Sequence, residues 1–163
     1  RLHGSKNIGA TNVLRLSGWK FGLLTLFLDF GKSIITLKYV ISINPDFLPG
    51  VSIALFLGHV FPIWLKFKGG KGIAVFVGII FSISLTHGLF FLITWIITAI
   101  LTRYSSLSAL VASISILIYN FYINSNSFSF LLLVLNILIF IKHKENIFRI
   151  LNKKESKIKL KIN

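Results

Sequence analysis

The residues best suited to chemistry lie in three blocks between long apolar runs. The first block, residues 4–15, reads GSKNIGATNVLR, and its candidate phosphate ligands are Asn7, Gly9, Thr11, Asn12 and Arg15. Small residues let backbone N–H groups approach an anion, and an arginine can hold that anion with two parallel hydrogen bonds. A glycine-lined helix interface is the alternative, but it does not explain the amides, the hydroxyl group and the arginine. The block favours anion binding, with Arg15 as the clamp.

The second block, residues 58–72, reads GHVFPIWLKFKGGKG, and its candidate ligands are Lys66, Lys68, Gly69, Gly70, Lys71 and Gly72. Glycines at this density permit positive φ and expose N–H groups, so we expect an anion-binding nest between the lysines. Alternatively, the lysines only anchor the end of a membrane helix. The spacing is not that of a Walker A loop. We expect His59 to be a hydrogen-bonded helix end rather than a catalytic residue.

The third block, residues 143–149, reads HKENIFR. His143 and Asn146 are three residues apart and share one face if the segment is helical, so both are catalytic candidates. The histidines and acidic residues are scattered, with neither an HExxH spacing nor a Gly-x-Ser-x-Gly elbow. We therefore expect no metal site and no cofactor.

Composition places the chain in a membrane. Its 163 residues are 55% hydrophobic, with a mean hydropathy of +0.83. The net charge of +14 comes from 18 Lys and Arg against 4 Asp and Glu. These bases cluster at the ends of apolar runs, which favours lipid headgroups and a phosphorylated substrate over nucleic acid. The chain has no cysteine, which excludes disulfides and thiolate chemistry.

The apolar runs predict six membrane helices, at residues 21–43, 51–65, 73–85, 89–101, 107–122 and 128–141. Turns are expected at residues 44–46, 86–88 and 124–127. Asp29 and Lys32 share a face of the first helix, and charges inside a membrane need a partner. The basic segments 1–20, 66–71, 103 and 142–161 are separated by even numbers of helices, so all four fall on one side, the cytoplasmic side.

The blocks resemble the three signature motifs of the bacterial PlsY family, over residues 5–15, 58–72 and 143–155 in the same order. The family consists of membrane acyl-phosphate:glycerol-3-phosphate acyltransferases with seven membrane helices. The resemblance implies an all-α polytopic helix bundle in the bacterial inner membrane, with its active site on the cytoplasmic face. It also implies that residues 1–163 are one domain lacking the family's first helix, as an Arg at position 1 suggests.

Position by position, the resemblance assigns three kinds of role. It implies that Ser5, Arg15, His143 and Asn146 matter for activity, that the glycine-lysine loop binds glycerol 3-phosphate, and that Glu155, Asp29 and Lys32 support the structure. The chain departs from the family pattern at Lys6, where glycine is usual, and at Lys153-Lys154, where Gly-Thr is usual.

The implied reaction transfers a fatty acyl group from acyl-phosphate to the sn-1 hydroxyl of glycerol 3-phosphate, giving lysophosphatidic acid and inorganic phosphate. The expected partners are these two substrates, membrane lipids and the enzyme that makes acyl-phosphate. No histidine is followed at the fifth position by Asp, so the His-x4-Asp device of acyl-CoA-dependent enzymes is absent. Either His143 or a substrate phosphate takes the hydroxyl proton. The alternatives are a small transporter or channel for a phosphorylated metabolite and an anionic-lipid anchor.

Overall fold

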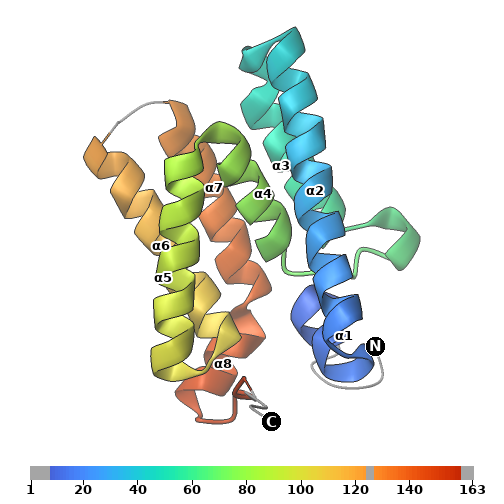
Figure 1. Cartoon of the computed structure of the whole chain (residues 1–163), viewed down its shortest axis with the longest axis vertical. Helices are drawn as coiled ribbons and strands as arrows, with labels where there is room; N and C mark the ends of the chain where they lie inside the picture. The colour runs from blue at the N-terminus through green and yellow to red at the C-terminus, as the bar shows by residue number, and fades with distance from the viewer. Residues whose placement is uncertain (1–7, 124–126, 159–163) are drawn as a thin grey trace. The chain divides into compact units, whose positions relative to one another are not determined.

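The computed structural model describes residues 8–123 and 127–158, apart from the side chains of Arg15 and Ser127. Every regular element in these ranges is a helix, as the all-α prediction requires (Figure 1). In chain order they are α1 (Ala10–Ser17), α2 (Trp19–Ile43), η1 (Pro45–Phe47), α3 (Leu48–Val60), η2 (Ile63–Leu65), α4 (Ile73–Ile83), α5 (Leu85–Thr102), α6 (Ser105–Ile123), α7 (Ser127–Lys142) and α8 (Lys144–Leu151). The chain divides into two compact units, Arg1–Gly88 and Leu89–Asn163.

Each of the six predicted apolar runs contains a helix. Within the described residues, three segments are long and apolar enough to cross a membrane, namely Pro45–Leu65, Leu85–Thr102 and Ser105–Ile123. Two further apolar helices, Ile73–Ile83 and Phe128–Lys142, are shorter than a perpendicular span. At 25 residues, α2 is long enough to span but carries charged side chains along its length. The polytopic helix bundle is confirmed, and the number of spans stays a prediction.

Two predicted boundaries are wrong. The expected turn at residues 86–88 lies inside the first turns of α5, and the break falls one turn earlier, at the extended residue Ser84 (φ −155°, ψ 126°). The Ser84 hydroxyl accepts a hydrogen bond from the His87 N–H at 3.4 Å, as a helix-capping serine does. The run predicted to reach Leu65 leaves the α-helix at Val60, because Pro62 cannot continue it.

The remaining predicted turns have different outcomes. Residues 44–46 form the expected turn, in which Asn44 Oδ1 accepts from the Asp46 N–H at 2.9 Å and η1 follows. Residues 124–126, most of the last predicted turn, lie outside the described residues.

The first unit is built around α2, against which α1, α3 and α4 pack. The chain turns from α1 into α2 at Gly18 (φ 87°), and α1 folds back along the start of α2 (Figure 1). Close packing of α2 on α4 requires a glycine, since a Cβ at Gly78 would lie 2.6 Å from the Phe30 carbonyl oxygen and 2.7 Å from Ser33 Cβ. This small-residue contact is typical of membrane helix pairs.

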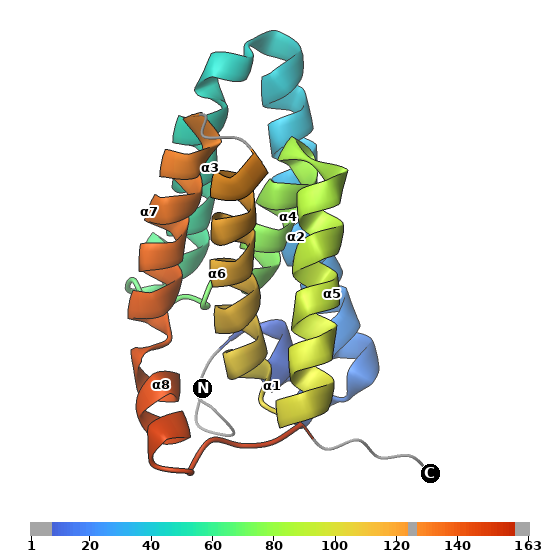
Figure 2. The ribbon, with the colours of Figure 1, turned by 90° about the vertical axis from the view of Figure 1, so that its left-hand side faces the viewer.

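In the second unit, α6 and α7 lie side by side and α8 follows the end of α7 (Figure 2). The side chains of Ala112, Ile116, Leu135 and Ile139 are fully buried. Buried polar contacts accompany this apolar core, among them a 2.8 Å hydrogen bond from Asn120 Nδ2 to Ser129 Oγ, which joins the two helices. The short helix α8 ends the pair and brings the third block to the start of α6.

The end of α8 yields a prediction on stability. Lys153 has φ 55°, its N–H donates to the Ile150 carbonyl at 3.0 Å, and the Lys154 N–H donates to the Arg149 carbonyl at 2.7 Å. This is the left-handed helix end that favours glycine, the residue that the family resemblance places here. We expect Lys153→Gly to raise the free energy of unfolding by about 1 kcal/mol. Thermal unfolding in detergent measures it, with Lys154→Gly as the control.

The control separates the two effects of a glycine. Lys154 is not among the described residues with positive φ, so Lys154→Gly only adds freedom to the unfolded chain and should leave stability unchanged or lower. Equal melting temperatures for the two variants would contradict the assignment of strain to Lys153.

Candidate active site

The first block leads into α1. Ser5 and Asn7 lie outside the described residues, and Arg15 lies in α1 with its side chain undescribed. Gly9 is the N-cap of α1, and its carbonyl accepts from the N–H groups of Asn12 and Val13 at 2.9 and 3.2 Å. Thr11 is exposed, whereas Asn12 is buried. The first turn of α1 carries no acidic residue, so the positive end of the helix dipole is compatible with an anion.

The predicted nest in the second block is not formed by its two adjacent glycines. The Gly69 N–H donates to the Val60 carbonyl at 3.1 Å, and the Gly70 N–H donates to the His59 carbonyl at 3.2 Å. These bonds close the loop that leaves α3, so both N–H groups are used within the protein. A Cβ at Gly69 would overlap the His59 carbonyl oxygen, which makes close packing the local reason for a glycine. Phosphate binding by this loop stays a prediction.

The part of this block whose backbone geometry is suited to an anion is its end. Gly72 (φ 82°) is the N-cap of α4, directly after Lys71, and the first turn of α4 has no acidic residue. A helix N-terminus preceded by a lysine is suited to phosphate. Lys66 and Lys68 are exposed on the loop, and Lys71 is half-buried. The lysine positions therefore fit phosphate binding better than the Gly69 and Gly70 N–H groups do.

A charged cluster on α2 and α3 accompanies this loop. Asp29 and Lys32 form the ion pair that their spacing predicts, with Lys32 Nζ 2.7 Å from Asp29 Oδ1. His59 joins them, its Nδ1 lying 3.0 Å from Lys32 Nζ and 3.3 Å from Asp29 Oδ1. His59 is at a helix end, as predicted. Its charged partners come from another helix, so no local spacing in the sequence could indicate them.

The two catalytic candidates of the third block are buried in the second unit. His143 is the N-cap of α8 and 2% exposed, and Asn146, in the first turn of α8, is 3% exposed. His143 Nδ1 lies 2.8 Å from the Ile139 carbonyl oxygen. A carbonyl can only accept, so this contact places the ring proton on Nδ1 and leaves the lone pair of the neutral ring on Nε2. Nε2 can then accept a proton or, in the imidazolium, donate to an anion.

Glu155 receives three side-chain hydrogen bonds. Its Oε1 accepts from Ser106 Oγ at 2.8 Å and from Asn146 Nδ2 at 2.7 Å, and its Oε2 accepts from Arg149 Nε at 2.7 Å. The bond from Nδ2 fixes the orientation of the Asn146 amide. Burial by itself raises the pKa of Glu155, but the hydrogen bonds from Arg149, Asn146 and Ser106 outweigh it and lower the pKa below 4.5.

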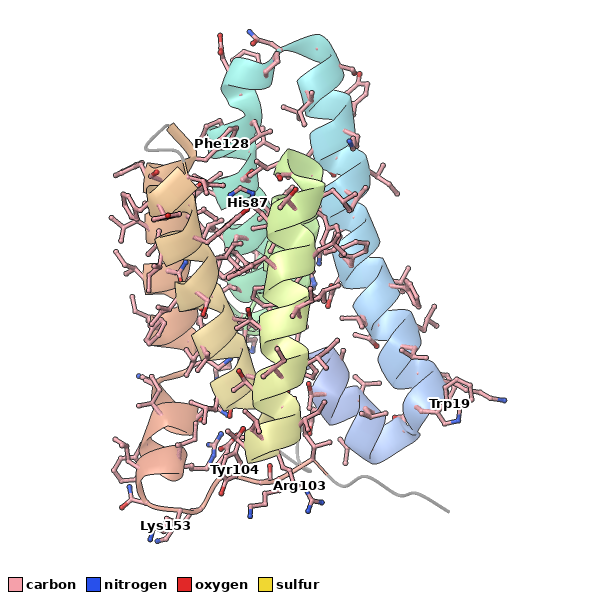
Figure 3. The ribbon with its side chains drawn as sticks, turned by 60° about the vertical axis from the view of Figure 1, so that its left-hand side comes forward. Trp19, His87, Arg103, Tyr104, Phe128 and Lys153 are labelled. Carbon is pink, nitrogen blue, oxygen red and sulfur yellow. The ribbon has the colours of Figure 1, made fainter. Side chains whose placement is uncertain are left out.

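The segment carrying Glu155 is held across the start of α6. The Ile158 N–H donates to the Arg103 carbonyl at 2.7 Å, and Arg103 Nη2 donates to the Ile158 carbonyl at 3.3 Å. Arg103, Tyr104 and Lys153 lie at the same end of the second unit (Figure 3). The contact between Ser106 and Glu155 could not be predicted from local spacing, because the two residues lie 49 positions apart. For Arg149 a signal existed, namely its i, i+4 spacing from Glu145.

The chain is similar to known proteins over most of its length. The family described as glycerol-3-phosphate acyltransferase matches residues 1–153. A protein of that name from Pelagibacter ubique is 47% identical over 158 residues, covering 96% of this chain and 82% of its own length. Another, from Brucella anthropi, is 42% identical over 155 residues, covering 95% and 77%.

The chain is also similar to two solved structures. The crystal structure of PlsY, an integral membrane glycerol 3-phosphate acyltransferase, in its glycerol 3-phosphate form has a TM-score of 0.90 and 35% identity, covering 96% of this chain and 80% of that one. The lysophosphatidic acid form of PlsY gives a TM-score of 0.89 at the same identity. The chain therefore belongs to the glycerol-3-phosphate acyltransferase family.

Proposed function

We propose that this protein transfers a fatty acyl group from acyl-phosphate to the sn-1 hydroxyl of glycerol 3-phosphate, releasing lysophosphatidic acid and inorganic phosphate. The observation that carries the proposal is the family match over residues 1–153, supported by the likeness to PlsY in its glycerol 3-phosphate form. Acyl-phosphate as donor is favoured by the absence of a His-x4-Asp spacing from the sequence.

The first and second blocks supply the groups suited to phosphate. Arg15 lies in α1, and Lys71 precedes the N-terminus of α4. A guanidinium fork, an ammonium group and helix N–H groups are the three kinds of donor that proteins use for phosphate. In this proposal they bind glycerol 3-phosphate, with Ser5, Asn7, Gly9, Thr11 and Asn12 in support, and the loop lysines Lys66 and Lys68 provide further positive charge.

The third block supplies His143 and Asn146, the residues that the resemblance assigns to activity. In the reaction, the sn-1 oxygen of glycerol 3-phosphate forms a bond to the acyl carbon, and the bond from that carbon to the phosphate oxygen breaks. The hydroxyl proton leaves to His143 Nε2 or to a phosphate oxygen of the substrate. Acyl-phosphate is already activated, so orientation and charge stabilisation provide most of the acceleration. The Asn146 amide, oriented by Glu155, can contribute to both.

The proposed location follows from the charges. The lysines and arginines concentrate in residues 1–20, 66–71, 103 and 142–161, and the positive-inside rule assigns such segments to the cytoplasm. We therefore propose the bacterial inner membrane, with the active site on the cytoplasmic face, where soluble glycerol 3-phosphate is available. Acyl-phosphate is reactive, which is consistent with a functional link to the enzyme that makes it.

The choice of donor provides the test. Purified protein is incubated with radiolabelled glycerol 3-phosphate and either palmitoyl-phosphate or palmitoyl-CoA. We expect labelled lysophosphatidic acid from palmitoyl-phosphate and none measurable from palmitoyl-CoA. Equal rates with the two donors would refute the donor assignment, and no product from either would refute the proposed function. A preparation made in the same way from cells that do not express the protein provides the background.

A further inference from the structure

The loop between α3 and α4 packs against one side chain from α3, that of His59. The Gly70 N–H donates to the His59 carbonyl, and a Cβ at Gly70 would overlap His59 Nε2. The backbone of Gly70 therefore lies directly against the imidazole edge. His59 contacts the loop both through its backbone and through its ring, so a movement of the ring would displace the loop.

The other edge of the ring is fixed by charges. Nδ1 lies 3.0 Å from Lys32 Nζ, and Lys32 Nζ in turn donates to Asp29 Oδ1 at 2.7 Å. Nδ1 also lies 3.3 Å from Asp29 Oδ1, so both members of the ion pair contact this nitrogen and orient the ring, with Nε2 at the edge that faces Gly70. The side chains of His59 and Asp29 are 10% and 18% exposed.

Such a cluster is costly within apolar helices. Asp29 and His59 are its more buried members, whereas the Lys32 side chain is 40% exposed. Burying a charge costs free energy that the attraction of a partner does not fully return, so a gain in stability is a weak explanation for the cluster. Here α2 and α3 run side by side (Figure 1), and the cluster joins them at the residue on which Gly70 rests. Its evident effect is to hold the His59 ring in one orientation.

We infer that His59, oriented by Lys32 and Asp29, is a positioning residue that sets the place of the glycine-lysine loop, Lys66–Gly72, and thereby the affinity for the phosphate of glycerol 3-phosphate. The inference rests on the proposed function. It gives Gly70 a specific reason to be glycine, namely contact with the His59 ring. The competing reason is direct approach of the Gly70 backbone to the substrate.

A double-mutant cycle separates the two reasons. In His59→Asn the side-chain amide oxygen lies close to the position that Nδ1 occupies in the wild type, so Lys32 keeps an acceptor. The substitution removes the ring edge that lies beside Gly70. We expect Gly70→Ala alone to raise the KM for glycerol 3-phosphate by about 10- to 100-fold, with a much smaller change in the KM for palmitoyl-phosphate. In the His59→Asn background, Gly70→Ala should raise this KM by less than about threefold, because contacting residues are coupled.

Gly69→Ala is the matched control. A Cβ at Gly69 would overlap the His59 carbonyl oxygen, which asparagine retains. The effect of Gly69→Ala should therefore be the same in the wild-type and His59→Asn backgrounds. Relief of both glycine variants by His59→Asn would indicate general loosening of the loop and would overturn the specific contact. Melting temperatures of all six proteins show whether each variant is folded.

Three other results would overturn the inference. An equal KM increase for Gly70→Ala in both backgrounds would assign Gly70 to direct substrate approach. A lower melting temperature for Gly70→Ala with an unchanged KM would reduce His59 to a packing residue. If a variant does not fold, the same coupling is measured with Gly70→Ser, and its absence counts against the inference. Wild-type protein that forms no lysophosphatidic acid would refute the proposed function itself, which distinguishes the two failures.

Discussion

Replacing Glu155 with alanine is expected to lower the free energy of unfolding by about 3 kcal/mol. The carboxylate is 6% exposed and accepts hydrogen bonds from Ser106, Asn146 and Arg149. Alanine leaves these donors without their acceptor in a partly buried place, and the loss of an acceptor for charged Arg149 contributes most. Thermal unfolding in detergent measures the effect. Activity should fall as well, because the Asn146 amide loses the contact that orients it.

The matched control is Glu145→Ala. Glu145 also contacts Arg149, with its Oε2 3.7 Å from Arg149 Nη1, but the Glu145 side chain is 77% exposed. An exposed pair of this kind contributes less than about 1 kcal/mol, so Glu145→Ala should be nearly neutral for stability and activity. Similar losses in the two variants would show that removal of any charge near Arg149, rather than of the buried acceptor, is responsible.

Acid pH should lower the stability of the wild-type protein in the same way as Glu155→Ala. The pKa of Glu155 is lowered in the folded protein, so the folded state favours the carboxylate and gains stability from it above the ordinary pKa of 4.5. As the pH falls through 4.5 and then through the lower folded pKa, this contribution is lost. Glu155→Gln cannot titrate at this position. Its melting temperature should therefore fall less steeply below pH 4.5 than that of the wild type, and parallel curves would contradict the lowered pKa.

Replacement of Arg15 should have the largest effect on catalysis. If Arg15 clamps a substrate phosphate with two parallel hydrogen bonds, lysine keeps the charge but loses the planar fork. We expect Arg15→Lys to lower kcat/KM for glycerol 3-phosphate by about 10²- to 10³-fold, and Arg15→Ala to lower it further. Steady-state kinetics on folded, membrane-inserted protein measure both.

Lys20 is the control for charge alone. It lies in the first turn of α2, where its ammonium group is 5.9 Å from the centroid of the Trp19 ring. A basic residue that only anchors a helix end can be replaced with little effect on kcat/KM, so Lys20→Ala should retain most of the activity. Near-normal kinetics for Arg15→Ala would reduce Arg15 to the same anchoring role.

Much of the fold could be predicted because its signals are local. Membrane helices can be predicted from apolar runs, and each of the six predicted runs contains a helix in the structure. The Asp29–Lys32 pair also follows from local spacing, since residues three apart share a helix face. The break at Ser84 escaped prediction because one extended, hydrogen-bonding residue was enough to end α4, while the more conspicuous Thr86-His87-Gly88 could continue as helix.

The contacts within the candidate site were decided by tertiary structure. The sequence indicated the glycines of the second block, and glycine composition alone fits both an anion nest and close packing. Only the fold shows that Gly69 and Gly70 donate to the carbonyls of Val60 and His59. Likewise, Glu155 meets Ser106 across 49 residues, and His59 meets Lys32 across 27. Local spacing fixes which residues share a helix face, but a partner on another helix is chosen by how the helices pack, and no short stretch of sequence contains that information.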